Sequence, residues 1–146
     1  MSSINVLLKK ARPDVPDPVY ATEGAAGCDI HADEDVTLGP EGRALVSTGL
    51  FIQLPPDYEC QVRPRSGLAL KHGVTVFNTP GTIDEDYRGE LKVLLHNASH
   101  LDFEVQRGMR IAQLVFAPVV RAKFQAAAEL GDTVRGTGGY GSTGTR

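Results

Sequence analysis

The segment YECQVR, residues 58–63, shows the period of the sequence most clearly and decides the fold class. Tyr58, Cys60 and Val62 alternate with three polar residues, a period of two that predicts a β-strand with one buried face. Six further segments of strand composition surround it, each bounded by Gly, Pro, Asn or Asp: INVLLK (4–9), GRALVSTG (42–49), LFIQLP (50–55), GVTVF (73–77), ELKVLLHN (90–97) and RIAQLVFAPVV (110–120). Many short strands without long helices between them predict an all-β sandwich or barrel.

Two short segments have helical composition. SGLALKH, Ser66–His72, predicts one or two helical turns directly after the strand at 58–63, and FQAAAEL, Phe124–Leu130, is a second candidate. With 146 residues the chain has the size of one domain with a core of its own. We expect a single β-barrel domain over residues 1–133, followed by a flexible glycine-rich arm over residues 134–146.

Composition and charge exclude several classes of protein. The chain is 41% hydrophobic with a net charge of -3, which predicts no general attraction to nucleic acid or to a membrane surface. Cys28 and Cys60 form no CxxC motif, and the apolar run near the N-terminus is too short for a signal peptide. We therefore expect a cytoplasmic protein with reduced thiols.

Two polar clusters suit the binding of an anion. AAGCDIHA (25–32) places Asp29 on a predicted strand, although a plain turn that enters the sheet explains the same residues. PRSGLALKHGV (64–74) places Arg65, Ser66 and Gly67 where a strand gives way to a helical turn, so that a guanidinium, a hydroxyl and free N–H groups come together. An N-cap serine beside an exposed arginine is the alternative.

Two further clusters carry polar residues inside apolar surroundings. NTPGTIDEDYRGE (78–90) has turn signals at both ends and predicts a β-hairpin, whose backbone edge can pair with a flat ligand such as a base. Asp84 follows Ile83 there, and we expect it to be partly buried and able to act as a general base toward water, unless it is simply solvated. RGMRIAQLVF (107–116) places Gln113 in a core strand, where its amide must find a partner.

The chain ends on RGTGGYGSTGTR, residues 135–146. Its G-x-G-x-x-G spacing lacks the strand and helix of a dinucleotide-binding fold. A flexible backbone with Arg135 for charge and Tyr140 for stacking can wrap a phosphate-bearing ligand, whereas a disordered tail is the simpler reading.

Taken in order, these five stretches resemble the five motifs of the trimeric deoxyuridine 5′-triphosphate nucleotidohydrolases, the dUTPase family. The resemblance covers about residues 25–143. It implies a distorted β jelly roll, a homotrimer with shared active sites, Mg²⁺ as cofactor, and hydrolysis of dUTP to dUMP and pyrophosphate, which lowers dUTP and supplies dUMP for thymidylate synthesis.

The resemblance also implies roles for residues around the base and sugar. Asp84 corresponds to the aspartate that orients and deprotonates the water attacking the α-phosphorus. Tyr87 would stack under the deoxyribose and leave no room for a 2′-hydroxyl. The uracil edge would be read by Asn78 and by the backbone of Gly81, Thr82 and Ile83.

Other roles concern the phosphate chain. Ser66 and the Gly67 N–H would contact phosphate, and Arg65 would pair with Asp29, which meets the metal through water. The remaining residues assigned to the substrate are Lys92, Arg110 and Gln113 in the body, and Arg135, Tyr140, Gly141, Ser142 and Thr143 in the arm. In that arm the tyrosine ring would cover uracil, while the other side chains close on the γ-phosphate.

Two alternatives share the scaffold. A dCTP deaminase uses a glutamate in the strand after the I-D hairpin, where this chain has the apolar Leu94. A non-catalytic nucleotide-binding module would need no general base, although the chain retains Asp84.

Overall fold

The computed structural model describes residues 2–146, which contain twelve strands and one α-helix. The strands are β1 (Leu7–Lys10), β2 (Val19–Tyr20), β3 (Cys28–His31), β4 (Val36–Leu38), β5 (Arg43–Ser47), β6 (Leu50–Gln53), β7 (Tyr58–Arg63), β8 (Val74–Val76), β9 (Gly81–Ile83), β10 (Lys92–Asn97), β11 (Phe103–Val105) and β12 (Arg110–Pro118). Helix α1 (Ser66–His72) lies between β7 and β8 and ends at Gly73, whose φ of 66° is readily adopted by glycine.

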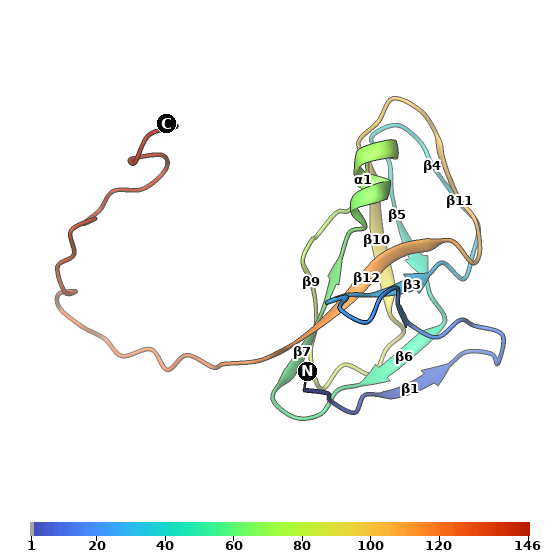
Figure 1. The fold of residues 1–146 in the computed structure, drawn as a ribbon, viewed down its shortest axis with the longest axis horizontal. Coiled ribbons are helices and arrows are strands. Elements are labelled where there is room, and N and C mark those ends of the chain that lie inside the picture. The colour runs from blue at the N-terminus through green and yellow to red at the C-terminus, as the bar shows by residue number, and fades with distance from the viewer. Residues whose placement is uncertain (1) are drawn as a thin grey trace.

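The strands form four antiparallel sheets that wrap around one core as a distorted jelly roll (Figure 1). The largest sheet has the order β2-β3-β12-β7-β9, and a second has the order β5-β10-β8. Two-stranded pairs, β1-β6 and β4-β11, complete the body. The fold class predicted from the alternating pattern is confirmed.

The core takes its side chains from every sheet. Ile30, Val46, Leu95 and Leu114 belong to four strands of the two larger sheets and have at most 1% of their surface exposed. Removal of such side chains from water is the main stabilising contribution to a domain of this size. Two free thiols, at Cys28 and Cys60, are also buried in this core.

One fully buried polar side chain has its hydrogen-bonding groups satisfied. The Asn97 amide nitrogen donates to the carbonyl oxygens of Leu38 at 2.9 Å and Leu101 at 2.7 Å, and its oxygen accepts from the Ser99 N–H at 3.0 Å. This side chain therefore fastens the loop after β10 to the end of β4 without the cost of an unpaired buried amide.

Each of the seven predicted segments contains a strand, shorter than predicted in five of them, while β7 has the predicted bounds and β1 is shifted to Leu7–Lys10; α1 occupies the predicted residues Ser66–His72. The second helix is wrong, because Phe124–Leu130 has no helical structure and is fully exposed. Seven residues are too few to form a stable helix without a packing surface, and Phe124 is 98% exposed in the single chain.

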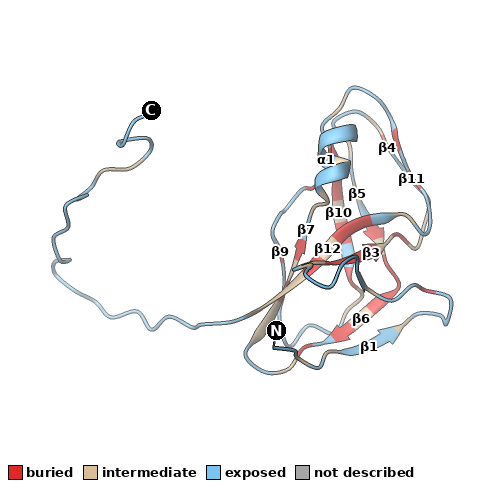
Figure 2. Ribbon diagram, in the orientation of Figure 1, coloured by how far each residue is buried: buried red, intermediate tan, exposed pale blue. Residues whose placement is uncertain are grey.

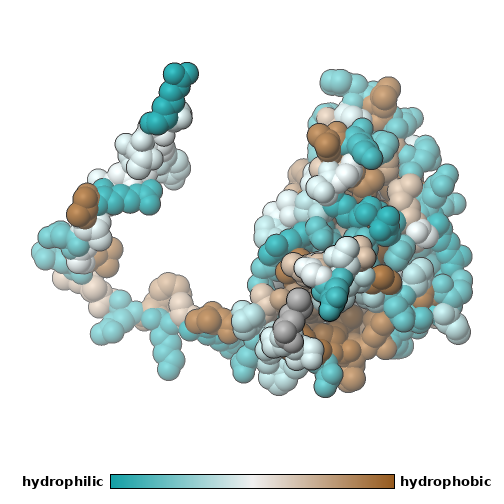
Figure 3. Space-filling model, in the orientation of Figure 1, coloured by the Kyte–Doolittle hydropathy of each residue, from teal (hydrophilic) through white to brown (hydrophobic). Residues whose placement is uncertain are grey.

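After β12 the chain leaves the body. Residues 119–146 contain no strand or helix and extend away from the sheets (Figure 1), and almost all of them are exposed (Figure 2). Apolar side chains recur along this segment without neighbours (Figure 3), among them Val120, Phe124 and Leu130. Among the described residues, no helix is long and apolar enough to cross a membrane.

Candidate functional site

Three polar residues lie in one row across the large sheet. In the antiparallel register, Gln113 of β12 stands opposite Asp29 of β3 on one side and opposite Arg63 of β7 on the other. Residues opposite one another project from the same face of a sheet. The row forms the floor of a pocket of about 440 Å³, whose walls come from residues 21–27 and from the start of α1.

Asp29 is the electrostatic centre of this pocket. The expected ion pair with Arg65 is present, with Arg65 Nε 3.1 Å from Asp29 Oδ1, and Arg110 Nη1 lies 3.1 Å from Oδ2. The carboxylate is almost fully buried, at 9% exposure, so two guanidinium partners offset its loss of hydration. His31 follows on the same strand, and burial, together with the positive charge of Arg110, lowers its pKa.

The start of α1 is held against this floor. The Gln113 amide nitrogen donates to the carbonyl oxygen of Pro64 at 3.1 Å, which is the partner that the polar amide requires. Gly27 lies so close that a Cβ atom there would be 2.2 Å from Gln113 Oε1. Ser66 and Gly67 are exposed at the rim of the pocket, with the first N–H groups of α1 beside them.

The segment expected to read a base lies on a different edge. The predicted β-hairpin over 78–90 is wrong in its pairing, since β8 pairs with β10 while β9 pairs with β7. A long-range partner has therefore replaced the local one. Gly81 is buried against Val62, and the Asn78 amide nitrogen lies 3.4 Å from the position of a Cβ on Gly81. Thr82 is exposed and Ile83 half-buried beside them.

Asp84 is exposed in the single chain, so the expected partial burial is wrong. It begins the turn after β9, in which the Tyr87 N–H donates to the Asp84 carbonyl at 3.1 Å. This turn borders a second pocket of about 650 Å³ shared with Glu59 and Arg121, apart from the Asp29 pocket.

Tyr87 has a fixed position beside that turn. Its hydroxyl donates to the Glu90 carbonyl at 2.9 Å, and its ring lies against Gly89, where a Cβ atom would be 2.4 Å from the hydroxyl. Part of the side chain is open to a ligand, because the residue is 43% exposed. Lys92 follows on β10, with its amine 3.8 Å from Glu90.

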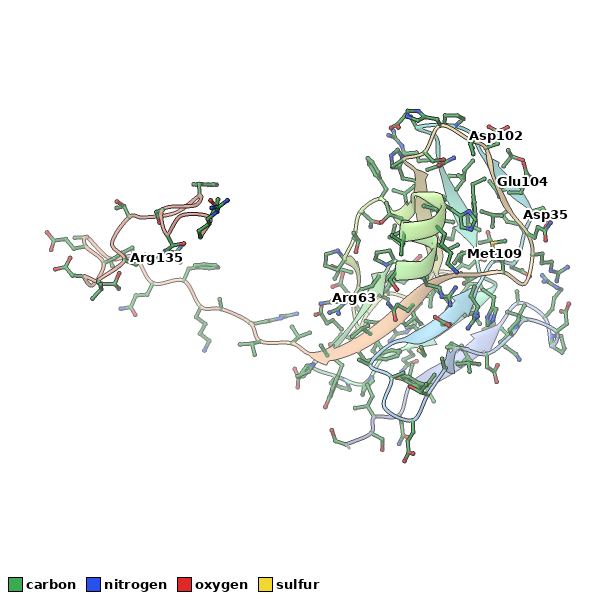
Figure 4. All side chains as sticks on the ribbon, turned by 45° about the horizontal axis from the view of Figure 1, so that its top comes forward. Asp35, Arg63, Asp102, Glu104, Met109 and Arg135 are labelled. Atoms are coloured by element: carbon green, nitrogen blue, oxygen red, sulfur yellow. The ribbon has the colours of Figure 1, made fainter. Side chains whose placement is uncertain are left out.

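The candidate residues of the arm lie apart from both pockets. Arg135 Nε donates to the Gly138 carbonyl at 2.8 Å, within the arm itself, and Tyr140 is fully exposed. Gly141, Ser142 and Thr143 are exposed as well. Figure 4 shows Arg135 on the extended segment, far from Arg63 at the edge of the body.

Arg63 is a pocket residue that the motifs did not identify. The signal was present, because the alternation in residues 58–63 places Arg63 on the polar face of the strand that leads directly into Arg65 and Ser66. No motif includes it.

The Asp29 carboxylate of the pocket fits a metal held through water. Among residues 2–146, no group of three or more His, Cys, Asp or Glu side chains is arranged as a metal cage. Asp29 gives one lone pair of each oxygen to an arginine, and a carboxylate oxygen has a second lone pair that can accept a hydrogen bond from metal-bound water. This donor set suits a hydrated Mg²⁺ chelated by phosphates.

Comparison with known proteins identifies relatives along almost the whole chain. A family model described as dUTPase matches residues 14–144. The deoxyuridine 5′-triphosphate nucleotidohydrolase of Nautilia profundicola is 56% identical over 137 residues, which cover 94% of this chain and 96% of the relative. The enzyme of the same name from Brucella melitensis is 56% identical over 132 residues, covering 88% and 84%.

Solved structures share the fold. The dUTPase of Staphylococcus bacteriophage 80alpha, solved with dUpNHpp, superposes with a TM-score of 0.88 at 24% identity and covers 97% of this chain and 99% of its own. A dUTPase mutant of phage phi11, described with a structural Mg(II) ion, gives a TM-score of 0.80 at 20% identity, covering 88% and 99%. The sequence relatives, the family match and this shared jelly roll agree, and the chain belongs to the dUTPase family.

Proposed function

We propose that three copies of this chain assemble the sites at which it hydrolyses dUTP to dUMP and pyrophosphate. One observation carries the proposal: the candidate residues occupy three separate places on one chain. The Asp29 pocket holds the phosphate-binding residues, Asp84 borders another pocket, and the arm reaches neither. A closed trimer brings all three places to each nucleotide.

In this assembly the Asp29 pocket binds the triphosphate. Ser66 and the N–H groups at the start of α1 donate to phosphate oxygens, and Arg65 and Arg110 supply positive charge from the floor. Gln113 uses one amide hydrogen on Pro64 and keeps the other for the substrate. These donors are held by protein contacts before the substrate arrives, so little reorganisation accompanies the reaction.

Asp84 of a second copy acts as the general base. Its carboxylate accepts a proton from the water that attacks the α-phosphorus, and pyrophosphate leaves from the opposite side. Tyr87, held by Glu90, presents its free face to the deoxyribose, and the backbone of β9 with Asn78 offers donors and acceptors to the uracil edge. Selection of uracil and exclusion of a 2′-hydroxyl therefore come from the same subunit that supplies the general base, Asp84.

We further propose Mg²⁺ as the cofactor, with Asp29 orienting its water shell. A bound Mg²⁺ would neutralise negative charge on the phosphates while that charge shifts toward the leaving pyrophosphate. The arm of a third copy closes over the nucleotide with Arg135, Ser142 and Thr143 on phosphate and Tyr140 on the base. We place the reaction in the cytoplasm, in keeping with the two free thiols.

The reaction is tested by the release of pyrophosphate from dUTP, UTP, dTTP and dCTP, with and without Mg²⁺. We expect rapid release from dUTP with Mg²⁺ and little from the other three nucleotides. Ammonia release from dCTP, or equal rates on UTP and dUTP, would contradict the assignment.

The role of Asp84 is tested by the variant Asp84→Asn, which keeps the size of the side chain but cannot take the proton. We expect turnover to fall by at least ~10²-fold, with affinity for dUpNHpp close to that of the parent. Asp102→Asn, an exposed carboxylate in the loop before β11, is the matched control. Parental turnover in Asp84→Asn would remove this residue from the mechanism.

A further inference from the structure

We infer that Arg63, a residue outside the five motifs, binds the terminal phosphates of the substrate. The inference rests on the proposed function of the Asp29 pocket and adds a side chain to it. Arg63 lines this pocket together with Arg65, Ser66 and Gln113. It is exposed, so its guanidinium is open to a ligand.

The position of Arg63 follows from the sheet register. Arg63 stands opposite Gln113, and Val115, the next pocket residue on β12, stands opposite Gln61. Since β7 continues through Pro64 into Arg65 and Ser66, the guanidinium of Arg63 lies on the same floor as these residues. A ligand that touches Gln113 and Ser66 is therefore next to Arg63.

A short chain of hydrogen bonds orients this arginine. The Gln61 amide nitrogen donates to Glu59 Oε1 at 2.7 Å, and the amide oxygen accepts from Arg63 Nε at 3.0 Å and from Nη2 at 2.7 Å. A carboxylate can only accept, so Glu59 fixes which end of the amide faces Arg63. The guanidinium is thus held in place by a neutral oxygen, and its Nη1 group is not engaged in these bonds.

The charge of Arg63 distinguishes it from its neighbours. Arg65 and Arg110 both bind the carboxylate of Asp29, which offsets part of their charge. Arg63 forms no ion pair with any carboxylate in residues 2–146, and its direct partner, Gln61, is uncharged. Of the three arginines around the row, Arg63 has the charge most available to an incoming anion.

The chemistry of the ligand selects the terminal phosphates as the target. The β- and γ-phosphates carry most of the negative charge of a nucleoside triphosphate and leave together as pyrophosphate. A planar guanidinium can donate to two phosphate oxygens at once. Arg63 therefore favours a triphosphate or free pyrophosphate over a monophosphate.

The test compares the parent with Arg63→Ala and Arg63→Lys in the full-length chain, with Arg43→Ala as a control that removes an exposed arginine from β5, outside the pocket. Steady-state kinetics with dUTP is measured at several salt concentrations, together with inhibition by pyrophosphate and by dUMP. Thermal unfolding and oligomeric state are recorded for each variant.

Loss of a charge-assisted contact predicts a KM for dUTP raised about 10- to 100-fold in Arg63→Ala, with kcat within about threefold of the parent. The inhibition constant of pyrophosphate should rise by a similar factor in Arg63→Ala, and that of dUMP should not change. The KM and the pyrophosphate inhibition constant of Arg63→Lys should lie between those of the parent and of Arg63→Ala. The salt dependence of KM should become shallower as well.

Two results would overturn the inference: a KM in Arg63→Ala no different from that in Arg43→Ala, or equal weakening of dUMP and pyrophosphate. The second would mean that Arg63 only shapes the pocket. Failure of the parent to hydrolyse dUTP would instead refute the proposed function. Direct binding of pyrophosphate and of dUMP to the parent and to Arg63→Ala, measured by calorimetry, would then decide the role of Arg63.

Discussion

At the scale of single residues, His31 is the titrating group with the clearest physical setting. Burial and the charges of Arg110 and Arg65 lower its pKa, and the charge of Asp29 opposes them only in part. Its Nδ1 atom is buried without a partner among the described residues. Folding therefore favours the neutral imidazole of His31 relative to the unfolded chain, in which the histidine has its ordinary pKa.

This arrangement predicts how stability depends on pH. A histidine whose pKa is lowered by folding makes its full contribution to the free energy of unfolding at pH values above its unfolded pKa of about 6.5. This contribution is lost as the pH falls toward the lower pKa of the folded state, because the unfolded chain then binds more protons. We expect the melting temperature to fall between pH 7 and pH 5.5 (roughly this window), and less so in His31→Gln. The exposed His100→Gln should behave like the parent. The same pH dependence in all three proteins would contradict this account.

At the scale of elements, the contact between Gly27 and Gln113 couples the first motif to the fourth and, through the bond from Gln113 to Pro64, to the second. A side chain at residue 27 would occupy the place of the Gln113 amide, which holds Pro64 at the entrance to α1. Gly24, three residues earlier, has open space around it. A substitution at Gly27 therefore tests the steric requirement, whereas the same substitution at Gly24 tests only the loss of backbone flexibility.

We therefore expect Gly27→Ala to displace Gln113 and lower kcat/KM for dUTP by about 10-fold or more, because a small displacement of positioned groups is costly. Gly24→Ala should leave kcat/KM near the parental value. Both variants are compared at equal concentration after their folding has been verified by thermal unfolding. Parental activity in Gly27→Ala would show that Gln113 tolerates another position.

Sequence patterns predicted those elements whose signal is local. The alternation at Tyr58–Arg63 and the helical turns at Ser66–His72 were both found in the structure. The partner of β9 was not predictable, because pairing with β7 depends on the packing of the whole sheet rather than on the turn at Pro80–Gly81. The prediction of a helix at Phe124–Leu130 was wrong for a related reason. Composition favoured the helix, but the segment packs against no surface of this chain.

The residues of the candidate site also divide into those that local motifs predicted and those that they did not. The pair Asp29–Arg65 follows from motifs one and two, which lie in adjoining parts of one pocket. The expected partial burial of Asp84 was wrong, because the apolar neighbour Ile83 belongs to β9 whereas Asp84 begins the exposed turn after it. Arg63 was overlooked because no motif includes it: the alternation placed it on the polar face of its strand, but only the register of β7 against β12 places it opposite Gln113.

At the scale of the whole molecule, the proposed distribution of the site over three chains makes a prediction that no single-chain site shares. Asp84→Asn and a chain truncated after Thr133 should each be folded and nearly inactive, the first without a base and the second without the arm. Mixed trimers contain sites with Asp84 from one chain and the arm from another. Random mixing in equal amounts should restore about a quarter of the sites.

The measurement is dUTP turnover after the two variants have been unfolded and refolded together, with each variant refolded alone as the control. Restored turnover requires that base and arm come from different chains. No recovery in verified mixed trimers would place both on one chain, and an active truncated protein would show that the arm is dispensable.

The two cysteines of the core have a consequence for the chemistry of the cell. Burial raises the pKa of the Cys60 thiol to about 12 and raises that of Cys28 as well. Thiolate, the form that reacts with peroxides and alkylating agents, is therefore scarce at both positions near neutrality. Neither Cys28 nor Cys60 therefore offers a thiolate through which an oxidant or an electrophile could switch the folded enzyme off.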